Sequence, residues 1–288
     1  MLEQLSPPSM KPWQWVFFAA VFAAAFLLRV HDLSRIFLWL DETDLFNESI
    51  YGNHHRSLLD FAFGTRNGTT QSWGWSAIFW IVTRAFGPSI AVARMPTVLV
   101  NTAGVALLFA LVYRLLPESS VNRFWPALFA AIFAAISVVQ MNYSQQTYPY
   151  GATPFLALAV MLARFEVRAA AGVEWKATPR LFRAVTLYTA AISLSFCVHA
   201  SAALIPALSM AVIGFGALQG LRSQTGQERK RLLRWAAASA VIIVCAAALG
   251  PRTLNTATAR IWRIIMKRHR FMRSPICFCT PTGSAPMP

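Results

Sequence analysis

The acidic residues of this chain are concentrated in one short stretch. Of its 11 Asp and Glu residues, six lie between positions 32 and 60: Asp32, Asp41, Glu42, Asp44, Glu48 and Asp60. Bulky apolar residues at 37–40 lead directly into Asp41, which predicts that these carboxylates lie close to a membrane surface. A partly desolvated carboxylate has a raised proton affinity and can act as a general base. The alternative interpretation is a solvated loop that happens to be acidic.

Basic side chains and one histidine are further candidates for chemistry. The arginines near the acidic stretch could bind an anionic headgroup or simply anchor the interface; they are Arg56, Arg66, Arg84 and Arg94. His199 is the only ionisable side chain well inside an apolar run, which makes it a functional candidate, or an ordinary histidine at a turn near Pro206. His54 and His55 are adjacent and form a poor ligand pair, so no metal site is predicted. The cofactor is unknown, with a divalent metal as an open alternative.

The composition indicates a membrane protein. Hydrophobic residues make up 56% of the 288 and charged residues 13%, with a mean hydropathy of +0.48. A soluble domain carries roughly 25% charge, so a cytosolic domain, a disordered chain and a disulfide-stapled module are excluded. The net charge of +15 does not indicate nucleic-acid binding, because most basic residues lie in short segments between apolar runs or after residue 251.

Apolar runs of suitable length recur along the chain. About 20 apolar helical residues cross a hydrocarbon core of about 30 Å. The candidate runs are 13–30, 95–116, 124–140, 150–165, 187–221 (long enough for two short spans folded back near 199–206) and 235–249. The sequence therefore predicts an all-α, polytopic transmembrane helix bundle of about seven spans. Residues 1–250 form this module, and residues 31–72 form a membrane-proximal first outer loop.

The charges of the connecting segments choose between two topologies. The run 73–86 is short, aromatic and interrupted by Arg84, so it either lies on the surface or crosses as a short span. If it lies on the surface, three basic connections share one side: Arg114/Arg123, 164–183 and 222–234. The polar segments 31–72 and 141–149 then share the other side. The positive-inside rule favours this arrangement, with both polar segments extracytoplasmic.

Several motifs in order along the chain resemble those of one family. These are Leu38-Trp39-Leu40-Asp41-Glu42 after the first span, the aromatic segment 73–87, Ala93-Arg94-Met95-Pro96-Thr97, the second polar segment from Tyr143 to Tyr150, and Phe196-Cys197-Val198-His199. Together they resemble the GT-C membrane glycosyltransferases of the protein mannosyltransferase and aminoarabinose transferase type. The resemblance covers about residues 10–220.

The resemblance implies transfer of a sugar from a polyprenyl-phosphate carrier to an acceptor at the extracytoplasmic face of the plasma (inner) membrane. Asp41 matches the catalytic acidic position and would take a proton from the acceptor hydroxyl, with inversion at the anomeric carbon. Glu42 would orient Asp41 or bind the acceptor. The substrate-binding residues implied or suggested by their position are Asp44, Arg56, Arg94, Tyr143, Gln146, Tyr148 and His199. The partners are then the lipid-linked sugar and membrane lipid, without nucleic acid.

The chain also departs from this family. Relatives have an acid and an arginine in the second polar segment, where this chain has Gln146 and Tyr148. The residues from 251 to 288 are basic, lack an apolar span and are predicted to be a disordered or aberrant tail. We therefore expect a C-terminally truncated family member. The alternative functions are a non-catalytic multi-pass membrane protein, an inactive fragment of such a transferase, or a transporter.

Overall fold

The computed structural model describes residues 10–34, 42–43, 73–116, 122–171, 178–198, 204–223 and 226–249. In these ranges the chain is helical and contains no strand, which confirms the all-α prediction at this level. The helices are α1 (Pro12–Val30), α4 (Trp73–Phe86), α5 (Ile90–Leu115), α6 (Phe124–Ile136), α7 (Val138–Ser144), the 3-10 turn η3 (Pro149–Gly151), α8 (Ala152–Ala171), α9 (Pro179–Val198), α10 (Leu204–Ser223) and α11 (Gly226–Leu249).

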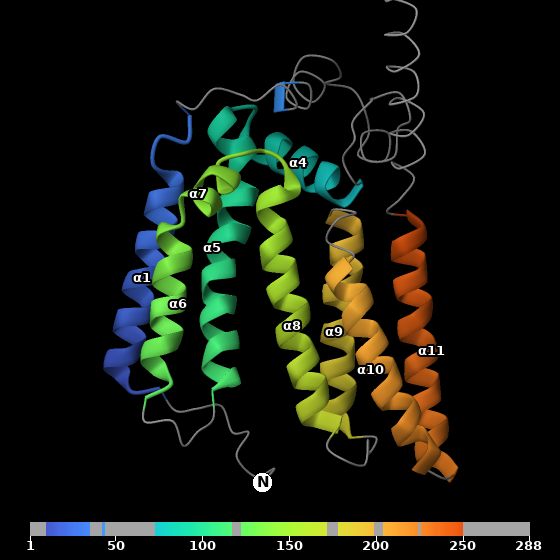
Figure 1. Cartoon of the computed structure of the whole chain (residues 1–288). Coiled ribbons are helices and arrows are strands. Elements are labelled where there is room, and N and C mark those ends of the chain that lie inside the picture. The colour runs from blue at the N-terminus through green and yellow to red at the C-terminus, as the bar shows by residue number, and fades with distance from the viewer. Residues whose placement is uncertain are drawn as a thin grey trace, which may run out of the picture.

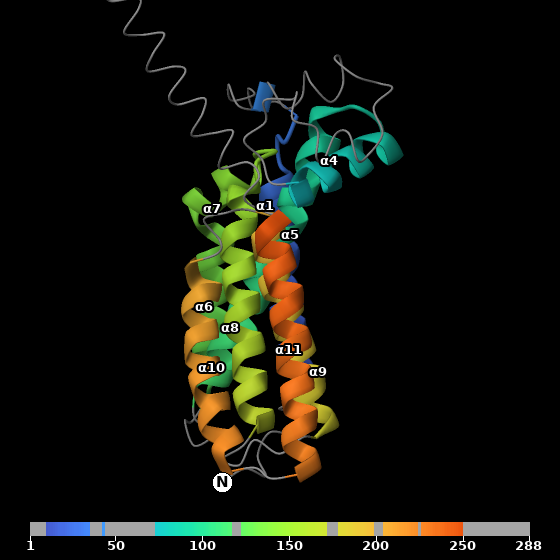
Figure 2. The ribbon, with the colours of Figure 1, turned by 90° about the vertical axis from the view of Figure 1, so that its right-hand side faces the viewer.

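The long helices form a bundle, and α4 lies across one of its ends (Figures 1 and 2). We term this the upper end, and the end where α1 begins the lower end. Helices α1, α6, α9 and α11 run towards the upper end, and α5, α8 and α10 run back (Figure 1). The basic starts of α9 and α11 and the basic ends of α5, α8 and α10 therefore share the lower end.

Four of the described helices are long and apolar enough to cross a membrane: α1, α5, α9 and α11. The pair α6 and α7 makes a fifth if it is one bent span. Helix α8 runs alongside them, but Arg164, Glu166 and Arg168 confine its uncharged stretch to 152–163. The described part of the chain thus has four to five candidate spans, and the total of about seven stays a prediction.

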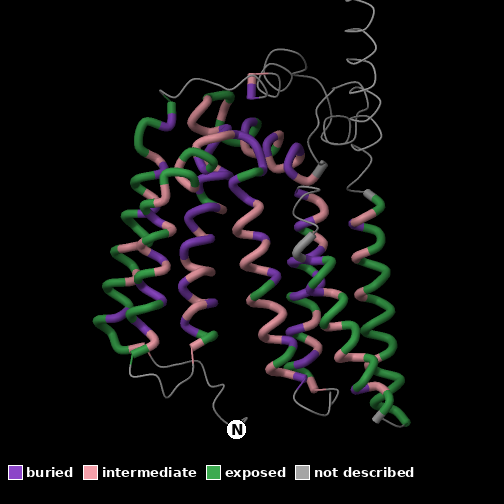
Figure 3. The backbone as a smooth tube through the Cα atoms, viewed as in Figure 1, coloured by how far each residue is buried: buried purple, intermediate pink, exposed green. Residues whose placement is uncertain are grey.

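The outer surface of the bundle is apolar. The outward faces of the helices are largely exposed (Figure 3). Their exposed side chains include many large hydrophobic ones, among them Phe17, Phe133, Phe215 and Val244. Only 6% of the apolar window of α11 and 17% of that of α1 is buried, against 44% for α5 and α9. A soluble protein rarely exposes contiguous apolar surface of this extent, so these faces fit a bilayer.

Two groups of buried side chains hold the bundle together. Ala127, Ala131 and Ala135 of α6 face α1 and α5 in one group, where small residues let helix backbones approach closely. Val160 and Val167 of α8 meet residues of α9 in the other. The ion pair of Arg114 with Glu166 joins α5 to α8 near the lower end. Packing of this kind fixes which helix ends meet at each end of the bundle.

Helices α6 and α7 meet at a bend of 57°. The bend leaves the carbonyls of the last turn of α6 without partners inside the helix. Arg29 of α1 donates to the carbonyl of Ala135 at 3.2 Å and to that of Ala134 at 3.0 Å. A cation at a helix C-terminus also complements the helix dipole. Arg29 therefore stabilises the bend from a neighbouring helix.

The helices extend further than the apolar runs. Arg164 and Arg168, which the sequence placed in a connection, lie inside α8, and α9 begins at Pro179 instead of 187. Residues 141–144 of the second polar segment continue as α7. Long basic side chains place their charge in water while their stems cover apolar surface, so a helix continues through them. The segment 73–86 is helical as α4, and Gly87 (φ 94°) turns the chain into α5.

Candidate functional site

A buried ion pair lies at the upper end of the bundle. The Arg94 guanidinium donates from Nη2 to Oε2 of Glu42 at 2.8 Å. Neither side chain is more than 1% exposed. Arg94 also donates from Nη1 to the carbonyl of Leu33 at 2.9 Å, which ties the end of the first span to α5. A buried charge is stable only when it is paired and hydrogen-bonded, and this pair meets both conditions.

The second polar segment and α4 join the same contact. The backbone N–H of Thr147 donates to Oε1 of Glu42, and the Trp75 indole of α4 donates to the Thr147 carbonyl at 2.7 Å. We term the set Leu33, Glu42, Trp75, Arg94 and Thr147 the Glu42–Arg94 junction. It connects four segments, and its contact of greatest sequence separation, between Glu42 and Thr147, joins residues 105 positions apart. Four of the five motif segments named from the sequence therefore contribute a residue to this junction.

Three tyrosines lie beside the junction. The Tyr148 and Tyr150 rings stack at 5.3 Å with 12° between their planes, and Tyr143 meets Tyr150 edge to face at 6.4 Å. Tyr148 is buried, whereas Tyr143 and Tyr150 are 43% and 42% exposed. Gln146 is half-buried and its backbone N–H donates to the Tyr143 carbonyl. The predicted residues Tyr143, Gln146 and Tyr148 are thus close together, with an aromatic surface facing outward.

A polar network lies below the junction, inside the bundle. The Asn101 amide of α5 donates to Gln140 Oε1 at 3.2 Å and to the Gly151 carbonyl at 3.0 Å. Its own Oδ1 accepts from Nε of Arg29 at 3.1 Å. Gln145 donates to the backbone carbonyls of Arg29 and His31. The network connects α1, α5, α7 and η3 directly beneath the second polar segment.

Gly151 permits this close approach. A Cβ at this position would lie 2.7 Å from the Tyr143 carbonyl oxygen and 2.7 Å from Cγ2 of Thr97. Both distances are shorter than real Cβ contacts, so only glycine fits without movement of its neighbours. The backbone at Gly151, directly after the Tyr143–Tyr150 segment, therefore packs against α5.

The network borders a cavity of about 330 Å³ between α5 and α8. Arg29, Asn101 and Gln140 provide its polar wall, and residues such as Leu108 and Phe155 provide the apolar one. Among the described residues, every oxygen to which the Arg29 guanidinium donates is a neutral carbonyl or amide oxygen. A cation balanced only by neutral oxygens attracts an anion, because the interior screens charge weakly.

The predicted site residues have different outcomes. Glu42 and Arg94 are in direct contact, so Arg94 holds Glu42 in this structure instead of facing a headgroup. Its predicted role as a headgroup ligand stays a prediction. Asp41, Asp44, Arg56 and His199 lie outside the described residues, as do the adjacent histidines 54–55 and the tail 251–288. Within the ranges that the structure describes, no group of three or more His, Cys, Asp or Glu side chains could hold a metal ion.

Sequence reasoning missed four residues that the structure places around the junction: Trp75, Asn101, Gln145 and Thr147. Asn101 carried a usable signal, because it is a lone amide inside an apolar run, and polar groups in a span seek partners. Arg29 lies at the edge of the apolar run 13–30, where interface anchoring also explains an arginine, so its position alone did not indicate a buried partner. Thr147 acts through its backbone, which side-chain chemistry does not reveal.

No known family model matches the chain, and no curated protein or solved structure matches it either. The resemblance to the GT-C glycosyltransferases therefore rests on the residues of the chain itself.

Proposed function

We propose that this protein is a membrane glycosyltransferase that moves a sugar from a polyprenyl-phosphate donor to an acceptor outside the cytoplasm. Asp41 is the general base. It takes the proton of the acceptor hydroxyl while the acceptor oxygen bonds to the anomeric carbon. The bond between that carbon and the lipid phosphate oxygen breaks, so the phosphate leaves with the electron pair and the configuration inverts.

The Glu42–Arg94 junction is the observation that supports this proposal most. Motifs that only share an order in the sequence converge at one buried ion pair. Since Asp41 and Glu42 are consecutive, anchoring Glu42 restricts where Asp41 can lie. Glu42 and Arg94 are then positioning residues, and the catalytic carboxylate is Asp41. This choice favours the orienting role for Glu42 over acceptor binding.

The donor chemistry fits the surroundings of the junction. A polyprenyl chain lies in the bilayer, so its phosphate arrives at headgroup depth. Arg29 lies in the last turn of α1, the first span. The cavity beside it combines this cation with an apolar wall. Tyr143 and Tyr150 offer exposed rings next to it, and aromatic residues are frequent at this depth.

The charge of the lower end supports the proposed orientation of the protein. The starts of α9 and α11 and the end of α10 carry seven Arg and Lys residues, and the positive-inside rule assigns such ends to the cytoplasm. The junction then faces the opposite side. The plasma (inner) membrane is the compartment that this proposal assigns.

A transfer assay with one matched pair of variants tests the proposal. Membranes that contain the chain are incubated with a radiolabelled polyprenyl-phosphate sugar, and label transferred to endogenous acceptors is counted. Loss of a general base lowers the rate by about 10²–10⁴-fold, so we expect Asp41→Asn to abolish transfer. Asp60→Asn removes a charge from the same acidic stretch and should retain it. Unchanged transfer by Asp41→Asn at equal membrane content would remove Asp41 from the mechanism.

A further inference from the structure

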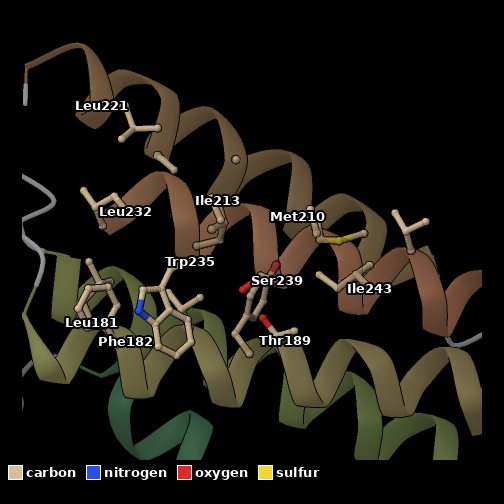
Figure 4. Close-up of a pocket in the computed structure, with 17 residues that line it drawn as sticks. Leu181, Phe182, Thr189, Met210, Ile213, Leu221, Leu232, Trp235, Ser239 and Ile243 are labelled. Atoms are coloured by element: carbon tan, nitrogen blue, oxygen red, sulfur yellow. The ribbon is translucent and has the colours of Figure 1, made fainter. Parts of the chain in front are cut away.

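A second cavity lies far from the junction, between α9, α10 and α11 (Figure 4). Its volume is about 390 Å³ and its wall is almost entirely carbon. Leu181, Leu221 and Leu232 line its part nearest the lower end, and Met210 and Ile243 line the inner part (Figure 4). Near the inner part, the Tyr188 hydroxyl donates to Ser209 at 2.8 Å and connects α9 to α10.

The dimensions of the cavity match one hydrocarbon chain. An apolar cavity of about 150 Å³ holds the six carbons of benzene, so 390 Å³ holds roughly 16 carbons. Along α11 the lining extends from Leu232 to Val244, which is about 18 Å at 1.5 Å per residue. Half of a hydrocarbon core of about 30 Å is close to this length. The cavity therefore extends from the lower end to about the middle of the bilayer.

Basic side chains are concentrated on the three helices near the lower end of the cavity. The described residues of α9, α10 and α11 include seven basic side chains and one acidic side chain, Glu228; the basic ones are Arg180, Arg183, Arg222, Arg229, Lys230, Arg231 and Arg234. Arg222 follows the lining residue Leu221, and Arg229 lies one helical turn before Leu232, on the same face of α11. Trp235 stacks on Phe182 at 5.1 Å, near these basic side chains.

We propose that this cavity binds one acyl chain of an anionic phospholipid from the leaflet at the lower end, with the lipid phosphate among these arginines. The apolar wall and the length of the cavity fit one acyl chain, and the basic side chains near its lower end fit an anionic headgroup. Basic pockets between spans on the cytoplasmic side bind anionic lipid headgroups by the same attraction. The proposal goes beyond the transferase activity and does not depend on it, because the two cavities share no residue.

Lipid retention by the full 288-residue chain tests the proposal. The chain is purified in detergent, mixed with equal amounts of palmitoyl-oleoyl phosphatidylglycerol and phosphatidylcholine, and bound lipid is counted by native mass spectrometry. We expect phosphatidylglycerol to be retained over phosphatidylcholine. Each arginine near a charged membrane surface contributes about fivefold in affinity, so Arg222→Gln with Arg229→Gln should lower retention by about 25-fold. Arg123→Gln with Arg168→Gln removes two charges of the same end outside the cavity and should have little effect.

Filling the cavity tests whether the acyl chain binds there, separately from the contribution of the basic side chains. Ala240→Leu adds carbon to the wall, and Ala238→Leu makes the same change on the opposite face of α11. Gly214→Leu fills the cavity from α10, where a Cβ meets nothing within 4 Å. We expect Ala240→Leu and Gly214→Leu to lose the lipid at least tenfold, and Ala238→Leu to retain it.

Three outcomes would overturn the proposal. Equal retention of the two lipids refutes the headgroup assignment. If both filling variants retain the lipid unchanged, with monodisperse elution and an unchanged melting temperature, the acyl chain does not bind in this cavity. A lipid-free dimer, or retention that appears only after residues 251–288 are removed, identifies a protein segment as the occupant instead.

Discussion

Replacing Glu42 by Gln leaves the buried guanidinium of Arg94 without the carboxylate that neutralises it. The amide oxygen can still accept from the backbone N–H of Thr147, but the amide NH2 then faces the guanidinium, so the change removes the charge and the hydrogen bond from Nη2 of Arg94. An exposed ion pair contributes about 0–1 kcal/mol, whereas removal of one partner of a buried pair costs about 3–5 kcal/mol. Because neither side chain is more than 1% exposed, the second value applies.

The double variant separates this charge effect from general damage. In Glu42→Gln with Arg94→Met no charge remains buried, and neutral replacement of a buried pair is often tolerated. The Leu33 carbonyl loses its donor, which costs about 1–2 kcal/mol. We therefore expect the double variant to be more stable than Glu42→Gln alone. The difference in unfolding free energy between the two variants should be about 2–3 kcal/mol.

Unfolding of the detergent-purified protein by added SDS, followed by tryptophan fluorescence, measures these free energies. His31→Gln is the control, because it removes only an exposed side-chain contact with Asp32 and should cost less than about 1 kcal/mol. If Glu42→Gln is no more damaging than His31→Gln, the pair is not desolvated in the membrane-embedded protein. The junction then does not anchor Glu42.

Two other predictions concern the backbone beneath the junction. Gly151→Ala should destabilise the protein by about 1–3 kcal/mol in the same unfolding assay, because the new methyl meets two neighbours at 2.7 Å. Gly214→Ala is its matched control, because open space surrounds the new methyl there, and it should change stability by less than about 1 kcal/mol. Arg29→Met should cost on the order of 3–5 kcal/mol, because the Ala134 and Ala135 carbonyls lose their donor. Arg29→Lys should recover part of that loss, and equal melting temperatures for the two Arg29 variants would contradict the role in the bend.

The positions of the helices follow from the apolar runs, but their ends do not. Runs at 13–30 and 124–140 correspond to α1 and to α6 with α7. Helix α11, by contrast, begins at Gly226 and not at 235, and α8 continues to Ala171. Hydropathy reports where a helix meets lipid, and it does not report where the backbone stops being helical. Basic residues with long stems are good helix formers, so the helices extend past the apolar boundary.

The site is less predictable than the helices for a different reason. The sequence indicated the acidic stretch and the second polar segment, but not that Arg94 neutralises Glu42 across 52 residues. Asp41 and Glu42 have the same chemistry and adjacent positions, so no local pattern selects Glu42 as a partner of Arg94. That choice depends on where α5 lies relative to the end of α1. It is therefore a result of tertiary packing, which local residue spacing does not encode.

The pairing of Glu42 also has a consequence for how the proposed transfer depends on pH. In the paired state the charge of Glu42 is balanced by Arg94, so Glu42 adds no uncompensated negative charge next to Asp41 in the chain. Arg94→Gln restores that neighbour, and a like charge makes a carboxylate easier to protonate. Since the base must be ionised, the acidic limb of the rate profile should move to higher pH in Arg94→Gln. In Glu42→Gln with Arg94→Gln no such charge is present, and the limb should return towards that of the unmodified protein.

The shape of a profile does not depend on how much folded protein is present, so this test distinguishes electrostatic positioning from lost stability. Identical limbs in all three proteins would show that Glu42 does not influence the base.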